Sequence, residues 1–190
     1  MRNKRWIGVL MMTCFFSLST LADVTVTLYL TTPDKSNAKN TKIRKESKAE
    51  NTLTDIGTIT FKNTVYGVMM TPDLHGLPPG MHGLHLHGIA SCKHKAKSAG
   101  DHYDPNHTGK HLGPYTSEGH LGDLPALYVD QKGVANHPIL APRLNESDLN
   151  GHAVIIHAGD DNYSDLPVAL GGGGDRIACG VIKNNAVNKQ

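Results

Sequence analysis

Histidine alternates with leucine in the stretch HGLHLHG, which covers residues 82–88. In an extended strand successive side chains point to opposite faces, so His85 and His87 share one face while the leucines share the other. Two imidazoles on one face can bind a transition metal, although an isolated pair is more often just the polar face of a half-buried strand. The metal interpretation therefore depends on further ligands elsewhere in the chain.

The loop sequence GDHYDPNHTGKHLGPYTSEGHLGD carries such ligands. His102, His111 and His120 follow one another at nine-residue intervals, and Asp123 comes three residues after the last of them. Three imidazoles and one carboxylate are a complete tetrahedral ligand set for zinc, and a set with no open position is structural. A loop as long as residues 89–124 needs something to organise it, and zinc binding would do so.

The remaining histidines divide into three groups. His157 ends the apolar run HAVIIH and extends the histidine-rich constellation. His82 has the strand parity of the leucines, so it is predicted to be buried and hydrogen-bonded rather than a ligand. The others are predicted to lie on the solvated surface: His75, His94, His107, His137 and His152.

Short runs in which apolar and polar residues alternate must position these histidines, and glycine, proline and asparagine bound the runs. Such runs are typical of β-strands, and no apolar stretch sustains a helical period. The pattern predicts an all-β sandwich or barrel with long loops. The expected strands cover residues 24–30, 57–61, 64–70, 83–88, 125–130, 152–157 and 176–182. The lysine-rich insertion at residues 32–52 is predicted to be solvated, with a basic docking arm as the alternative.

The N-terminal residues have the layout of a secretory signal peptide, with a basic start, an apolar run and small residues before Ala22. Cleavage after Ala22 would leave one soluble, exported domain at residues 23–190, since no second apolar segment follows. A lipid anchor on Cys14 is the alternative. Removing residues 1–22 takes away three of the 19 basic residues and none of the 17 acidic ones, which changes the net charge from +2 to −1. This near-neutral charge argues against a general affinity for nucleic acid or an anionic membrane.

Cys92 and Cys179 are the cysteines of the processed chain. An even pair in an exported protein predicts a disulfide, and two buried free thiols are the alternative. In the chain-entropy model, closing the loop between Cys92 and Cys179 removes unfolded-state entropy worth about 4 to 5 kcal/mol.

In order along the chain, these motifs resemble the exported bacterial copper/zinc superoxide dismutases. The resemblance runs from about Gly57 to Ile182, through LPPGMHGLHLHG, HYDPNHTGKHLGP, GHLGDLPALYVD, APRL, HAGDDNYSD and LGGGGDRIACGVI. It implies a Greek-key β-sandwich, or flattened barrel, with long metal-binding and electrostatic loops. It also implies an antioxidant oxidoreductase that converts superoxide to dioxygen and hydrogen peroxide by alternate reduction and reoxidation of copper.

The resemblance implies a role for each candidate residue. The copper ligands would be His85, His87, His102 and His157, and the zinc ligands would be His102, His111, His120 and Asp123. His102 would bridge the two metals and hold a proton during turnover. Arg176 would bind the arriving anion beside copper, and Asp161 would hydrogen-bond a ligand of each metal. A Cys92–Cys179 disulfide would tether the ligand loop to the last strand.

The resemblance further implies a periplasmic enzyme with one copper and one zinc per chain, which protects the cell envelope from superoxide. It predicts no stable membrane association and leaves both a monomer and a homodimer open, because both occur in the family. This chain departs from the family in three places. Asp101 replaces the usual glycine before the bridging histidine, the loop with KHKAK at residues 93–97 is shorter, and the insertion 32–52 has no recognised counterpart.

Three other classes explain the sequence less well. A copper-delivery relative would be expected to lack copper ligands or the arginine, and this chain keeps them all. A zinc hydrolase needs an open zinc position and a nearby general base, whereas the zinc set here is closed. A metal-free adhesion sandwich would leave the histidines without an explanation.

Overall fold

The computed structural model describes residues 23–31 and 53–183, and short strands dominate them. The strands are β1 (Val24–Leu30), β2 (Asp55–Thr64), β3 (Gly67–Leu74), β4 (Gly80–His82), β5 (Leu84–His87), β6 (Leu127–Val129), β7 (Ile139–Ala141), β8 (Ala153–His157) and β9 (Arg176–Val181). Three short 3-10 helices complete the described elements: η2 (Lys97–Ala99), η3 (Glu146–Asp148) and η4 (Leu170–Gly172). No helix in these ranges is long and apolar enough to cross a membrane. The predictions for residues 1–22 and 32–52 lie outside the described residues.

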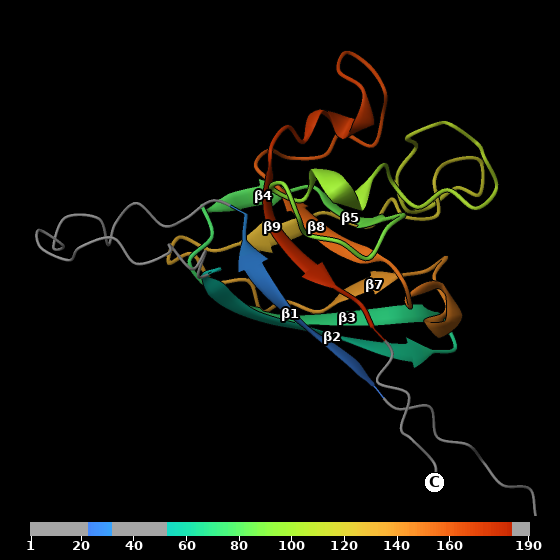
Figure 1. The fold of residues 1–190 in the computed structure, drawn as a ribbon. Helices are drawn as coiled ribbons and strands as arrows, with labels where there is room; N and C mark the ends of the chain where they lie inside the picture. The colour runs from blue at the N-terminus through green and yellow to red at the C-terminus, as the bar shows by residue number, and fades with distance from the viewer. Residues whose placement is uncertain (1–22, 32–52, 184–190) are drawn as a thin grey trace, which may run out of the picture.

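Seven strands form one antiparallel sheet in the order β5-β8-β9-β1-β2-β3-β7, and β4 pairs with β6 in a separate ribbon. Figure 1 shows the sheet curling from β2 and β3, through β1 and β9, to β8 and β5. The first and last described strands, β1 and β9, therefore pair with each other. This architecture confirms the predicted all-β fold with long loops.

The alternation of buried and exposed residues is interrupted in β2. Ile56 and Ile59 are both buried although they lie three positions apart, which in a regular strand would place their side chains on opposite faces. The pairing of β2 with β1 shifts register at this point, as it does in a β-bulge. Gly57 occupies the bulge with φ 110°, and a Cβ there would lie 2.0 Å from the carbonyl oxygen of Asp73. The bulge therefore requires glycine at this position.

Both faces of β5 and β8 are buried, for different reasons. The leucines of β5 enter the main core, while His85 and His87 lie on the opposite, outer face. In the β5–β8 pairing His85 is opposite Ile155 and His87 is opposite Ala153. These two apolar residues belong to a second small cluster with residues of the loop that follows β5. The outer face is thus covered by loops, and the histidines lie between sheet and loop.

A disulfide joins Cys92 to Cys179 across 87 residues of sequence, with a Cα–Cα distance of 5.8 Å. It fastens the loop after β5 to β9, which confirms the predicted bond. Beyond η2, residues 100–126 contain no strand or helix longer than an isolated bridge. This irregular segment carries several of the candidate ligands and packs over the sheet edge formed by β5.

Candidate metal centre

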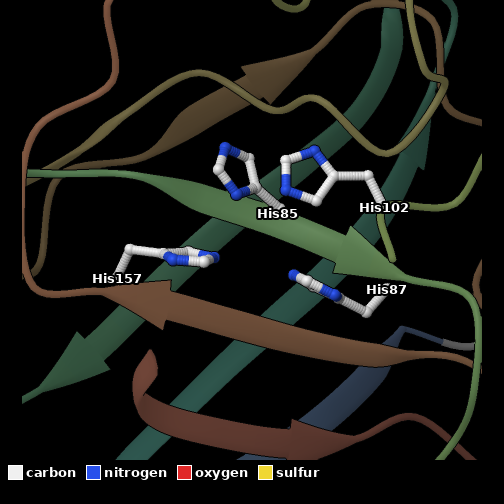
Figure 2. Close-up of side chains that lie close together, drawn as sticks. All are labelled: His85, His87, His102 and His157. Carbon is white, nitrogen blue, oxygen red and sulfur yellow. The ribbon is translucent and has the colours of Figure 1, made fainter. Parts of the chain in front are cut away.

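Four histidine side chains come together on the outer face of β5 and β8 (Figure 2). His85 and His87 project from β5, His157 ends β8, and His102 enters from the irregular loop. The ring nitrogens that these side chains offer lie within 4.8 Å of one another, and all four residues are buried. The structure therefore brings together residues that are separated by as many as 72 positions in the sequence.

In each ring one nitrogen is held by an oxygen. The contacts are His85 Nε2 to Asp161 Oδ2 at 2.7 Å, His87 Nδ1 to Gly100 O at 2.9 Å, His102 Nδ1 to Asp123 Oδ1 at 2.9 Å, and His157 Nδ1 to Gly174 O at 3.2 Å. The other nitrogens are buried without a hydrogen-bond partner: His85 Nδ1, His87 Nε2, His102 Nε2 and His157 Nε2. Since an unpaired buried polar atom is costly, this arrangement fits a set of metal ligands oriented by their second nitrogens.

Burial keeps this histidine set uncharged. Desolvation lowers the pKa of His85 to about 3, that of His87 to about 2 and that of His157 to about 4. Desolvation also lowers the pKa of His102. The imidazoles are therefore neutral at physiological pH, and only a neutral imidazole offers the lone pair that a metal ion needs.

Asp123 is the centre of a second buried cluster. Its Oδ1 lies 2.9 Å from His102 Nδ1, 2.9 Å from His111 Nδ1 and 3.2 Å from His120 Nδ1. Burial raises the pKa of Asp123, but hydrogen bonds from His102 and His111 outweigh this effect and hold the pKa below its usual range. The four residues can offer ligand atoms within 4.8 Å of one another, and His102 belongs to both clusters.

Asp161 contacts one histidine of each cluster. Its Oδ2 is 2.7 Å from His85 Nε2, and its Oδ1 is 2.8 Å from His111 Nε2 and accepts the backbone N–H of Tyr163 at 2.8 Å. Burial raises the pKa of Asp161, but the hydrogen bonds from His111 and His85 outweigh it and keep the group ionised. In His111 burial lowers the pKa, and hydrogen bonds to Asp123 and Asp161 reverse the effect and raise it to about 9.

Arg176 begins β9 beside the first cluster. Its Nη1 donates to the carbonyl of Ala96 and its Nη2 to that of Gly100, both at 2.7 Å. The Gly100 carbonyl also lies against His87 Nδ1, so one backbone oxygen links the guanidinium to a histidine of the set. Burial lowers the pKa of Arg176, and the nearby Asp101 carboxylate opposes that shift.

A surface cavity of about 520 Å³ opens at Arg176. Its wall includes the basic residues Lys95 and Lys97 and the acidic residues Asp101 and Asp175. Gly174, whose carbonyl contacts His157, also lines the cavity, as does Gly100. The cavity thus adjoins the first cluster, and a small anion entering it would meet the guanidinium next to the histidines.

The structure also tests the histidines that were predicted to lie outside the clusters. His82 is buried and places its ring nitrogens 2.8 Å from the carbonyl oxygens of His157 and Pro78, which confirms a buried, hydrogen-bonded histidine. The surface prediction is confirmed for four residues: His75, His94, His107 and His137. It is wrong in part for His152, which is half-buried with its ring 4.0 Å from that of Tyr103.

Several supporting groups were not identified from the sequence. The carbonyls of Gly100 and Gly174 orient imidazoles, but a backbone carbonyl has no side-chain signature. Asp165 accepts the backbone N–H of His111 at 2.9 Å, and Arg143 donates to carbonyls of the loop that carries His120. Neither residue has a spacing that would distinguish it from an ordinary surface charge.

Comparisons with known proteins agree with this geometry. Residues 56–182 match the family model described as copper/zinc superoxide dismutase (SODC). A superoxide dismutase [Cu-Zn] from Photobacterium leiognathi is 54% identical over 136 residues, covering 67% of this chain and 79% of that protein. A superoxide dismutase [Cu-Zn] from Legionella pneumophila is 47% identical over 181 residues, covering 95% of this chain and 99% of that protein. The solved Cu/Zn superoxide dismutase from Brucella abortus matches with a TM-score of 0.70 at 36% identity, covering 85% of this chain and 100% of that one.

Proposed function

Because the chain belongs to the copper/zinc superoxide dismutase family, we propose how its residues divide the work of converting superoxide to dioxygen and hydrogen peroxide. The cofactors are copper and zinc, and the enzyme is an oxidoreductase. The observation that carries the residue assignment is the set of buried ring nitrogens that face one another without a hydrogen-bond partner.

The first cluster is assigned to copper. Its proposed ligand atoms are His85 Nδ1, His87 Nε2, His102 Nε2 and His157 Nε2. Imidazole nitrogen is a suitable ligand for copper, and an all-nitrogen set matches the tetragonal preference of copper(II). Copper bound there supplies the one-electron exchange of the two half-reactions, which zinc, having no redox chemistry, does not.

The second cluster is assigned to zinc. Its proposed ligands are His102, His111, His120 and Asp123. Three imidazoles and one carboxylate fill a tetrahedral set, so this site has no position for substrate and acts by holding the loop in place. Asp161 orients the imidazoles of His85 and His111 through their outer nitrogens, which couples the geometry of one set to that of the other.

His102 and Arg176 are assigned to the reaction itself. Two superoxide anions and two protons give one dioxygen and one hydrogen peroxide, since one anion is oxidised and the other is reduced. His102 Nε2 would take up one proton from water in the first half-reaction, when it no longer serves as a copper ligand, and donate it to the reduced anion in the second, while Nδ1 stays with the Asp123 cluster. Water supplies the second proton. Arg176 keeps N–H groups beyond the two that its carbonyl contacts occupy, and these bind the anion in the adjoining cavity.

The proposal extends to the compartment in which the enzyme works. The layout of residues 1–22 supports export, and the Cys92–Cys179 disulfide is the kind of bond that persists in an oxidising space. We therefore infer that the mature chain, residues 23–190, acts in the periplasm and protects the cell envelope from superoxide.

Metal analysis combined with superoxide consumption tests this proposal on the purified exported protein. We expect one copper and one zinc per chain, with rapid dismutation that depends on copper. A protein that retains zinc alone and still consumes superoxide, or one that binds both metals and does not, would contradict the assignment.

A further inference from the structure

Arg143 lies in the APRL sequence directly after β7, 20 residues after Asp123 and 14 residues before His157. Its guanidinium is half-buried and donates only to backbone carbonyls in the described contacts. Nε donates to Pro114 O at 3.1 Å, Nη1 to Gly119 O at 3.2 Å, and Nη2 to Gly113 O at 3.3 Å and to His120 O. One side chain thus contacts the backbone at both ends of residues 113–120.

The four accepting carbonyls belong to buried residues of the irregular loop. A strand or helix would satisfy such carbonyls internally, but residues 100–126 contain neither beyond isolated bridges. In the described contacts the His120 carbonyl also accepts the backbone N–H of Asp123 at 3.3 Å, whereas the carbonyls of Gly113, Pro114 and Gly119 have no donor from the loop. Three of the four carbonyls therefore depend on an outside donor. Arg143 supplies it from a segment that is anchored to the sheet through β7 and its pairing with β3.

Asp123, a proposed zinc ligand, holds the backbone of the same loop at residues 112–113. Asp123 Oδ2 accepts the backbone N–H groups of Leu112 at 3.1 Å and Gly113 at 3.3 Å. Gly113 is thus fixed through its N–H by Asp123 and through its carbonyl by Arg143. His120, a second proposed ligand, has its own carbonyl bound by the same guanidinium.

We propose that Arg143 is a positioning residue of the zinc set: it holds the backbone between His111 and His120 so that their imidazoles converge on Asp123. This inference rests on the proposed function, because it takes the second cluster as the zinc site. Arg143 does not contact the ligand atoms themselves; it acts through the loop backbone. Outer groups of this kind change metal affinity by about 10- to 100-fold when they are removed.

The hydrogen-bond geometry of Arg143, and not its charge, carries this role. The positive charge of Arg143 repels a metal cation bound nearby, so its charge alone would weaken zinc binding. The guanidinium offers five N–H donors in a rigid planar fork, which can serve several carbonyls at once. A lysine side chain carries its three donors on one nitrogen at the end of a flexible chain. It cannot reach the carbonyls of residues 113–114 and those of residues 119–120 at the same time.

The test compares zinc release from the copper- and zinc-loaded mature protein to a chromogenic chelator. In Arg143→Met we expect zinc to dissociate about 10-fold faster or more, with copper content unchanged, and in Arg143→Lys we expect most of that acceleration to remain. Lys62→Met is the matched control, because Lys62 is an exposed residue of β2 away from the loop. Its zinc release should equal that of the parent.

Amide hydrogen exchange, measured by mass spectrometry on the same proteins, separates loop positioning from general destabilisation. We expect faster exchange in the peptide that contains residues 112–121 of both Arg143 variants, and unchanged exchange in β2 and β3. Zinc release from Arg143→Met at the parental rate would overturn the inference, as would full rescue by Arg143→Lys. If Arg143→Met does not fold, Arg143→Lys alone decides between the same outcomes. A parent protein that binds no zinc would instead refute the proposed function.

Discussion

Single residues determine which nitrogen each histidine presents. Because Asp161 takes Nε2 of His85, that ring presents Nδ1, whereas His87 and His157 give Nδ1 to backbone carbonyls and present Nε2. The partner of the outer nitrogen therefore sets the tautomer and orientation of the inner one. A substitution in either cluster should be judged by which of these contacts it removes.

Asp123→Ala is the residue change that best separates the two proposed sites. It removes the carboxylate that lies between His102, His111 and His120, so we expect zinc affinity to fall by more than about 100-fold while copper is retained. Metal analysis after dialysis against a chelator checks this. Loss of both metals in equal measure would show that the sites cannot be separated in this way.

Arg176 should govern substrate capture without governing metal content. Removing its cation in Arg176→Ala should slow dismutation by roughly tenfold or more, since local electrostatic steering accelerates association by about 10 to 1000 times. Arg176→Lys keeps the charge but loses the paired carbonyl contacts, so an intermediate rate is expected. Pulse radiolysis at matched copper and zinc content measures both variants. A parental rate in Arg176→Ala would exclude the assigned role.

Asp101 opposes Arg176 within the same cavity, and its carboxylate repels an arriving anion. We expect Asp101→Asn to raise the dismutation rate by about 2-fold at low ionic strength and to lose that advantage at high salt, where surface charges are screened. Asp73→Asn is the control, because Asp73 is an exposed residue of β3 that changes the net charge equally. If both variants respond alike, net charge rather than the cavity carboxylate is the cause.

At the scale of elements, alternation predicted the six strands of four or more residues, because a residue period of two is visible over that length. Of the three strands with only three residues, it found β6 (Leu127–Val129) within the longer run 125–130 and missed β4 (Gly80–His82) and β7 (Ile139–Ala141), where a period is too short to show. Strand parity predicted that His85 and His87 share one face, whereas the grouping of His102 and His157 with them followed only from the family resemblance. The carbonyls that orient the rings could not be predicted, since their positions depend on loop backbone that no side-chain pattern specifies.

The disulfide is the element-scale link between the loop and the sheet. It holds the segment that presents the Ala96 carbonyl to Arg176, so losing it should loosen the guanidinium as well as the fold. We expect the double substitution of serine for Cys92 and Cys179 to lower the free energy of unfolding by up to about 4 to 5 kcal/mol. Thermal and denaturant unfolding, with the parent under non-reducing conditions as reference, measure the change. An unaltered midpoint would contradict the stabilising role.

At the scale of the whole molecule, the processed chain would be close to neutral, so attraction of superoxide must come from the charges around one cavity. Processing itself is directly measurable. Intact mass of the exported protein should correspond to residues 23–190, and its fluorescence should come from tyrosine alone because Trp6 is the sole tryptophan. A retained N-terminus or a lipid on Cys14 would refute this. Sedimentation of the same sample distinguishes the monomer from the homodimer that the sequence leaves open.

The central claim is that the histidine set around His85 carries the redox reaction while the Asp123 set only holds the loop. The decay of a superoxide pulse, recorded with the mature parent protein and with His85→Ala at equal zinc content, tests it most directly. The account predicts that the parent accelerates the decay in proportion to its copper content and that His85→Ala, with zinc retained, leaves the decay at or near its spontaneous rate. Parental acceleration by a zinc-loaded His85→Ala protein would contradict it.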